Sequence, residues 1–273
     1  KLWKFLLLEI SCFNAGIKSL REQLESMLKN QRCHPNIINY LDDFENDRVP
    51  QDWLKIFYSQ NDILVSLEVW INQLRDRRQM LGTWYTVKHC DVMRLHLLQN
   101  PSNIFHVIKE AVAEKMKINL ENIFIEIRIV DIPHNPVEKS AFFSKITTQN
   151  SSTTVSSYTI VVSNVTLFNA TWAKDRYSLE FMHPSTTSRK SQDVYLSITA
   201  TSEDTKNIDD FQCPLYIISD FPTAQDLTFP NTHKFHEERN PIQFISIPTS
   251  CDPNEWSKRN VALYSCPPWH LPK

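Results

Sequence analysis

Val49–Trp84, with the sequence VPQDWLKIFYSQNDILVSLEVWINQLRDRRQMLGTW, is the most informative stretch of the protein. It places Trp53, Trp70 and Trp84 on two expected helices. Pro50 suits the start of the first helix, because proline fixes φ there without the loss of a needed N–H. No catalytic motif lies within or around the stretch. The pattern therefore indicates a mechanical or interaction part of a larger protein rather than a complete enzyme.

The glycine content is the unusual feature of the composition. The 273 residues include only two glycines, Gly16 and Gly82, where average usage of about 7% would give roughly nineteen. A P-loop, a dinucleotide-binding fingerprint and a nucleophile elbow each need clustered glycines. None of these sites can be built from this sequence, so any nucleotide that the protein uses binds elsewhere.

Charge and cysteine usage exclude several further classes of protein. The net charge of −2, from 29 basic and 31 acidic residues, predicts no nucleic-acid partner and no membrane partner. The six cysteines form no C-x-x-C pair, which favours free thiols in a reducing compartment. The N-terminal KLWKFLLLEISCF resembles a signal peptide, but Glu9 interrupts its apolar run. The first residue is Lys, which suggests an excised fragment.

The first part of the sequence has a helical pattern. A row of apolar residues, here called the seam, recurs at spacings of three and four and predicts a helix of about eight turns. The favoured interpretation is a helix packed lengthwise against other helices rather than a free coiled-coil dimer. A second helix is expected at Asn36–Phe44, and a later one begins at Pro101. The seam comprises Trp3, Leu6, Ile10, Phe13, Ile17, Leu20, Leu24 and Met27.

Two details of the helical part are also predicted. The inward side of the Asn36–Phe44 helix is expected to carry Ile37, Ile38, Leu41 and Phe44. The basic run Arg75–Arg78 is expected to pair with Asp76 and its neighbours rather than to bind phosphate.

At Asn122 the period of the apolar pattern changes to two. Alternation around Ile123–Val130 predicts a strand with one buried face. Pro133–Ser157 and Asp220–Pro241 have the composition of long loops. The predicted fold class is α+β, with a helical N-terminal half followed by an antiparallel C-terminal half resembling a β-barrel or sandwich. Further strands are expected at Tyr158–Val162, Val165–Trp172, Val194–Ala200, Pro214–Ser219, Ile242–Ile247 and Val261–Ser265.

Several short motifs follow one another along nearly the whole sequence. In this order they resemble the C-terminal region of a dynein heavy chain, more the axonemal than the cytoplasmic type. The motifs are Glu9, Phe13 and Asn14, similar to QE-x-x-RFN; Val49-Pro50 with Trp53, similar to V-P-x-x-W; Trp70, Leu74, Arg77 and Trp84 on the following helix; Ala170 and Trp172, similar to G-A-x-W; Cys213–Tyr216, similar to C-P-V-Y; and Trp256–Leu263, similar to W-x-x-RGVALL.

The resemblance implies a domain organisation and a role. Residues 1–48 would be helices at the end of the last AAA+ module, 49–121 the helical part of the C-terminal domain, and 122–273 its β-rich part. The domain would brace the motor ring and couple its motions during ATP-driven ciliary or flagellar movement. ATP and magnesium would bind in upstream AAA+ modules, so these 273 residues are expected to hold no catalytic residue, cofactor or metal.

The resemblance also implies partners and a location. The partners would be the other AAA+ modules of the heavy chain and, through the parent protein, intermediate chains, light chains and microtubules. The location would be the cytoplasm and cytoskeleton, in the cilium axoneme. The seam suits docking against a preceding module, and the tryptophans are expected to be core anchors. The structural or interaction candidates are Trp3, Ile10, Phe13, Ile17, Leu24, Trp53, Trp70, Trp84, Trp172, Cys213, Tyr216, Trp256 and Arg259.

The sequence departs from the family pattern at its turns. Three family glycines appear as Asn164, Asn169 and Asn260. Asparagine is among the few non-glycine residues that tolerate a left-handed backbone, so these turns are expected to persist. Met93 and Arg94 replace a bulky aromatic region.

Two other functions stay open at this point. A secreted, glycosylated binding module is the alternative suggested by three sequons, which begin at Asn150, Asn164 and Asn169. A metalloenzyme is suggested by His233 and His236, although H-x-x-H in an expected loop differs from the i, i+4 spacing of a helical zinc pair. The missing signal peptide and the loop context disfavour both alternatives.

Overall fold

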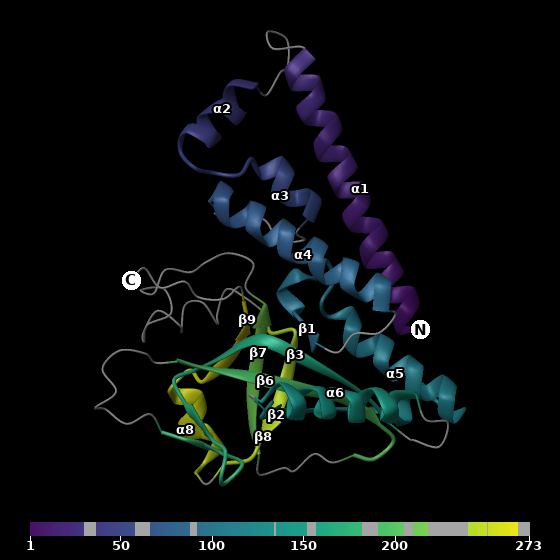
Figure 1. Ribbon diagram of the computed structural model, residues 1–273. Coiled ribbons are helices and arrows are strands. Elements are labelled where there is room, and N and C mark those ends of the chain that lie inside the picture. The colour runs from purple at the N-terminus through teal and green to yellow at the C-terminus, as the bar shows by residue number, and fades with distance from the viewer. Residues whose placement is uncertain are drawn as a thin grey trace.

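A computed structural model describes residues 1–29, 37–57, 66–87, 92–133, 135–151, 157–181, 191–204, 210–217, 240–249 and 251–266. Helices form the first half of the molecule, and a sheet with one covering helix forms the second (Figure 1). The predicted fold class, α+β with a helical N-terminal half, is confirmed. The helical half comprises α1 (Leu2–Lys29), α2 (Ile37–Glu45), α3 (Gln51–Phe57), α4 (Leu67–Val87), η1 (Leu95–Leu97) and α5 (Asn103–Met116).

The helix α1 is 28 residues long, which corresponds to about 42 Å. It packs against α3, α4 and α5, and it rises along one side of the helical half (Figure 1). Helices of the same molecule therefore cover the buried side of α1, as the interpretation of a helix with helical neighbours predicted.

The predicted inward face of α2 is confirmed at Phe44 but wrong at Ile38 and Leu41. Ile38 and Leu41 are 77% and 52% exposed, whereas Tyr40 is buried and Phe44 is half-buried. The rings of Tyr40 and Phe44 lie 5.8 and 5.3 Å from the ring of Trp53. The aromatic pair at i and i+4 faces inward because Trp53 offers it a ring to pack against, a contact that local periodicity does not reveal. The side chain of Ile37 is outside the described residues.

The second half is built on one mixed sheet. Its order is β2-β6-β3-β9-β7-β8, and β1 (Val92–Met93) pairs with β3. The prediction of an antiparallel sheet holds for most pairs, but β7 with β9 and β1 with β3 are parallel. The end strands β2 and β8 approach each other, so the sheet is a nearly closed barrel. The strands are β2 (Phe124–Val130), β3 (Ser157–Phe168), β6 (Ser191–Thr201), β7 (Phe211–Ile217), β8 (Gln243–Ile247) and β9 (Ala262–Ser265).

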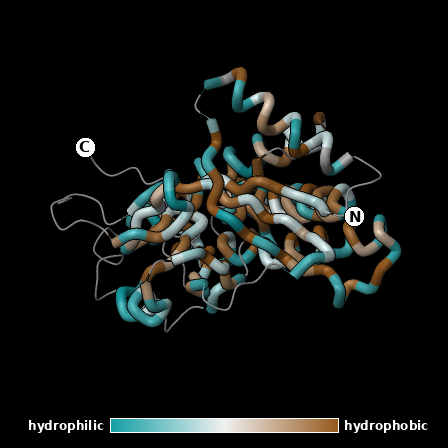
Figure 2. The backbone as a smooth tube through the Cα atoms, turned by 90° about the horizontal axis from the view of Figure 1, so that it is seen from below, coloured by the Kyte–Doolittle hydropathy of each residue, from teal (hydrophilic) through white to brown (hydrophobic). Residues whose placement is uncertain are grey.

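Smaller elements complete the second half. The strands β4 (Thr171–Ala173) and β5 (Ser178–Glu180) form a separate hairpin. The short helices η2 (Leu120–Asn122) and α8 (Pro253–Lys258) precede β2 and β9. Figure 2 shows that segments of hydrophobic residues run through the middle of the molecule. Among the described residues, none of the helices has the length and apolarity needed to cross a membrane.

The expected loop Pro133–Ser157 is wrong, because α6 (Pro136–Ser151) occupies most of it and lies against β3. The helix begins with proline, and the Asn135 side chain accepts a hydrogen bond from Val137 N at 3.0 Å. Val137 is 76% exposed, and the helix lacks the apolar stripe by which helices are detected from sequence. The other expected loop, Asp220–Pro241, lies almost entirely outside the described residues.

Candidate functional site

One buried carboxylate joins three separate segments of the helical half. Glu9 of α1 and Arg77 of α4 are both nearly inaccessible, and their Oε2 and Nη2 atoms are 3.1 Å apart. The same carboxylate accepts the backbone N–H groups of Gln99 at 2.8 Å and of Asn100 at 3.2 Å. We call these four residues the junction.

The junction must be well satisfied because its charges are buried. A buried ion pair is tolerated only when further hydrogen bonds satisfy its remaining polar atoms. The two backbone N–H groups supply such bonds to Glu9, and hydrogen bonds to an ionised acceptor are stronger than neutral ones. The Arg77 guanidinium also lies over the Phe13 ring, 5.3 Å from its centroid, a cation–π arrangement. The junction thus fixes α1, α4 and the segment before α5 relative to one another.

Close packing next to the junction fixes α1 against α3. A Cβ on Gly16 would lie 2.8 Å from both Ile56 and Phe57 side-chain atoms. The absence of a side chain at Gly16 therefore permits the two helices to approach. The other glycine, Gly82, would meet nothing within 4 Å, so it serves no comparable contact.

A second buried contact connects η1 to the sheet. The His96 backbone N–H donates to Ser265 Oγ of β9 at 3.3 Å, and His96 Nδ1 is 3.5 Å from the same oxygen. Burial, together with the nearby Arg94 charge, lowers the His96 pKa to about 3. His96 is therefore neutral near pH 7, and its imidazole links η1 to the last strand without a buried charge.

The predicted tryptophans of the helical half do not share one role. Trp53, Trp70 and Trp84 are all buried. Trp53 and Trp70 stack with their ring centroids 6.0 Å apart, and Trp53 Nε1 donates to Gln23 Oε1 at 3.0 Å. Trp3 is only half-buried and stacks on the exposed Tyr85. Trp3 therefore lies at the surface end of α1, away from the Trp53–Trp70 pair.

The seam is largely occupied within the molecule. Phe13 is buried, and Ile10 and Ile17 pack partly against the core. Leu24 is 39% exposed. Docking of a preceding module against the seam stays a prediction, and Leu24 is a seam residue that is exposed to such a contact.

The predicted residues of the β half are spread over several places. Trp172, Cys213, Tyr216 and Trp256 are buried. Burial raises the pKa of the Cys213 thiol, and burial and then Cys213 raise the pKa of Tyr216. Both therefore stay protonated near pH 7 and behave as packing groups.

Trp256 and Arg259 meet around a third aromatic residue. Phe181 stacks on Trp256 at 4.5 Å between ring centroids, and the Arg259 guanidinium lies 4.2 Å from the Phe181 ring centroid. Trp256 Nε1 also donates to Thr249 Oγ1 at 2.5 Å. These contacts hold α8 against the end of the β4–β5 hairpin.

The three asparagines that were predicted to form left-handed turns adopt that backbone. Asn164, Asn169 and Asn260 have φ angles of 57°, 60° and 54°. Asn164 lies where the register of β3 shifts between Val162 and Val165. The expectation that asparagine maintains these left-handed turns is confirmed.

Two of the sequon asparagines are held by their side chains. Asn150 donates to Thr159 O at 2.7 Å and accepts from Thr159 N at 2.8 Å. Asn169 Nδ2 donates to Asn260 O at 3.2 Å. These hydrogen bonds give both asparagine side chains a structural role that does not require a glycan.

The described residues give no support to the metalloenzyme alternative. His233 and His236 lie outside the described residues. Within the part of the sequence that the structure describes, no group of three or more His, Cys, Asp or Glu side chains is placed to hold a metal ion.

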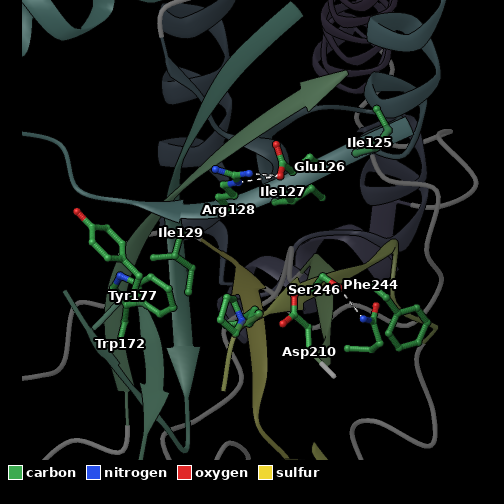
Figure 3. A pocket seen from close by; sticks show the side chains of 13 residues that line it. Ile125, Glu126, Ile127, Arg128, Ile129, Trp172, Tyr177, Asp210, Phe244 and Ser246 are labelled. Carbon is green, nitrogen blue, oxygen red and sulfur yellow. Dashed lines mark hydrogen bonds and ion pairs between the residues drawn. The ribbon is translucent and has the colours of Figure 1, made fainter. Parts of the chain in front are cut away.

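A cleft of about 420 Å³ lies where the barrel is not closed (Figure 3). It is bordered by β2, by β7 and β8, and by the β4–β5 hairpin, whose Trp172 and Tyr177 line one end. Lys174 of the hairpin pairs with Asp131 at 2.6 Å, directly after β2. The hairpin therefore closes one end of the cleft.

Sequence reasoning missed the role of the junction. The sequence predicts that Arg77 pairs near Asp76, but Arg77 pairs with Glu9, while Arg94 lies 3.4 Å from Asp76. The sequence did contain a signal for a buried ion pair. Glu9 and Arg77 carry opposite charges, and each interrupts the apolar face of its helix. Met93, which replaces a bulky aromatic region of the family pattern, is fully buried.

Comparison with known proteins gives one family. The matching family model describes the C-terminal domain of the dynein heavy chain, and the match extends over residues 2–265. The search of curated proteins found no match. The matched range includes both halves of the molecule and every residue of the junction.

Proposed function

The protein belongs to the family of dynein heavy-chain domains that form the C-terminal end of the motor, and on this premise we propose that it braces the AAA+ ring and couples the motions of the ring modules. Domains of this family lie outside the AAA ATPase sites, and membership implies contact with the AAA+ ring of the same heavy chain. The expected ATP and magnesium sites would then belong to upstream modules.

The junction is the observation that carries this proposal. Glu9 connects α1 to residues that are 68 and 90 positions away, by a buried hydrogen bond from Arg77 and a partly buried one from Gln99 N. A brace must transmit force without bending at its joints, and the three hydrogen bonds accepted by the buried Glu9 carboxylate give α1 one fixed orientation. The His96–Ser265 contact continues the connection from η1 to β9.

We propose that the sequence is organised in three parts. Residues 1–48 form the end of the last AAA+ module, 49–121 the helical part of the C-terminal domain, and 122–273 its β-rich part. A displacement of the last module would enter through α1, pass through the junction to α4 and α5, and reach the sheet that α5 contacts. The intermediate chains, light chains and microtubules are then partners of the whole motor.

We further propose a ciliary or flagellar motor, located in the axoneme within the cytoskeleton. The support is the resemblance of the motifs from Val49-Pro50 to Trp256–Leu263 to the axonemal type. Imaging of the tagged heavy chain in ciliated cells tests this part. Signal along the axoneme is expected, and signal confined to the cell body would contradict it.

The bracing role is tested in a motor fragment that contains the complete ring and this domain. Glu9→Ala is expected to lower microtubule gliding velocity and microtubule-stimulated ATPase activity, while ATP still binds upstream. The matched control is Glu255→Ala, which removes a carboxylate from an exposed ion pair on α8. Unchanged gliding in a Glu9→Ala motor whose junction is shown by hydrogen exchange to be open would overturn the proposal.

A further inference from the structure

The cleft of the barrel opens along strand edges rather than against a strand face. Five consecutive residues of β2, Ile125–Ile129, line it, and so do Ser246 and Ile247 at the end of β8 and Pro248 directly after it (Figure 3). Successive side chains of a strand point to opposite faces. A cavity that touches all of them must therefore lie beside the backbone, at the edge of each strand.

The two edges have the same direction. Antiparallel pairing relates β2 to β6, β6 to β3, β3 to β9 and β7 to β8, while β9 and β7 are parallel. Four reversals leave β2 and β8 parallel to each other. In the sheet formed by the described residues each of them has one strand neighbour, but the two strands approach each other, and just after β8 the Pro248 carbonyl accepts the Leu179 N–H at 3.2 Å. An added segment would therefore pair with the edge of β2 and run antiparallel to it.

The volume of the cleft fits a short extended segment. Strand spacing, sheet spacing and rise per residue of about 4.8, 10 and 3.4 Å give roughly 160 Å³ for one residue of a sheet. The cleft of about 420 Å³ therefore accommodates between two and three residues.

The charged side chains on β2 determine which residue types the bound segment should carry. Glu126 and Arg128 are two positions apart, and Arg128 Nε donates to Glu126 Oε1 at 2.8 Å. An antiparallel strand would place one residue opposite Arg128, the next opposite Ile127 and the third opposite Glu126. Opposite charges directly across a strand pair are stabilising. The complementary order, read from the N-terminus, is acidic, apolar, basic.

Exposed aromatic residues flank the cleft on both sides. Tyr177 of the hairpin is 69% exposed and Phe244 of β8 is 56% exposed, and both line the cleft. They lie toward opposite ends of it in Figure 3. Apolar residues on either side of the charged triplet would pack against these rings.

We propose that the barrel cleft binds an extended segment of a partner protein by strand addition, and that it selects segments with the order acidic–apolar–basic. The backbone edge of β2 supplies the hydrogen bonds, while Glu126 and Arg128 select the sequence. This site is separate from the junction and does not depend on the bracing role.

Fluorescence anisotropy with the complete 273-residue protein tests the proposal. The probe is the fluorescein-labelled peptide TVEVKVT, and its matched control is TVKVEVT, which has the same composition with the charges exchanged. TVEVKVT is expected to bind about tenfold more tightly, because two attractive cross-strand pairs replace two repulsive ones. TVEPKVT, whose central proline removes a backbone N–H, is expected not to bind.

A double charge exchange places the binding at this cleft. Glu126→Arg with Arg128→Glu is expected to reverse the preference, so that TVKVEVT binds more tightly. The control exchange is Glu255→Lys with Lys258→Glu, which inverts the exposed ion pair on α8 and should leave the preference unchanged. Melting temperatures of both variants verify that the protein is folded. Equal binding of the two peptides, binding of neither at about 1 mM, or a preference that survives the exchange would each overturn the proposal.

Discussion

In the helical half, the position of α1 depends on a few single side chains, whereas in the β half the core is spread along many paired strand residues. Glu9, Arg77 and Gly16 each make a contact that no neighbour duplicates among the described residues. By contrast, β3 pairs with β6 over ten residue pairs and also with β9. The helical half is thus specified by individual interactions and the sheet by a repeated pattern, so substitutions should have very different effects in the two halves.

The largest difference is expected between two carboxylates. Glu9→Ala leaves Arg77 as an uncompensated buried charge and should lower the free energy of unfolding by about 3–5 kcal/mol. Glu126→Ala removes a carboxylate whose partner Arg128 is 67% exposed, and should cost about 0–1 kcal/mol. Urea denaturation followed by circular dichroism measures both values.

A double substitution sharpens the comparison of the carboxylates. Glu9→Leu with Arg77→Met replaces the buried pair by apolar groups, and it should recover much of the stability lost in Glu9→Ala. Equal losses for Glu9→Ala and Glu126→Ala would show that the junction is not buried as described.

The next effect concerns pH and the contact between the two halves. The unfolded His96 binds a proton below about pH 6.5, whereas the folded His96 stays neutral until about pH 3. Its contribution to stability is therefore present above pH 6.5 and is lost as the pH falls, by about 1.4 kcal/mol per pH unit. Between pH 6.5 and 5 this amounts to roughly 2 kcal/mol.

The substitution His96→Gln isolates this contribution. Unfolding free energies of both proteins are measured at about pH 7.5, 6.5 and 5, and the loss on acidification should be smaller by about 2 kcal/mol in the variant. Parallel curves would mean that His96 is accessible to protons in the folded protein.

The two glycines offer a smaller test within the helical half. Gly16→Ala forces a methyl group against Ile56 and Phe57 and should cost about 1–3 kcal/mol. Gly82→Ala adds the same group at an open helical position and should stabilise by about 0.5–1 kcal/mol. Differential scanning calorimetry should show melting temperatures shifting in opposite directions. A shift in the same direction would contradict the close approach of α1 and α3.

The smallest effect is expected at a turn of the β half. Asn260 has a φ of 54°, so Asn260→Ala should destabilise by about 1 kcal/mol while Asn260→Gly should be nearly neutral. Chemical denaturation of the two variants gives the values. If Ala and Gly behaved alike, the left-handed conformation would not be what determines residue 260.

Patterns within one element were predictable from the sequence. The period of α1, the change of period before β2, and the left-handed turn at Asn164 all follow from local rules of spacing and backbone sterics. A barrel-like or sandwich-like sheet was predicted, but the parallel pairs of the nearly closed barrel were not, because strand order depends on contacts between residues far apart. The helix α6 was missed since its weakly patterned sequence resembles a loop.

Contacts between elements could not be predicted in the same way. The pairing of Glu9 with Arg77 spans 68 residues, and proximity along the sequence favours the closer Asp76 as the partner of Arg77. The barrel cleft depends on where β2 and β8 end relative to each other. Both sites therefore required the three-dimensional arrangement, although the residues that form them were visible from the start.

The contact between His96 and Ser265 has a consequence for biosynthesis. The two residues are 169 positions apart, so a ribosome that adds about 5–20 residues per second needs about 8–34 s to make the second after the first. During this interval α1, α4 and α5 can already pack, but η1 still lacks β9. The nascent domain thus closes from its N-terminal helices toward its last strand, and premature termination before Ala262 would release a polypeptide whose helical half is complete and whose buried histidine has no strand to cover it.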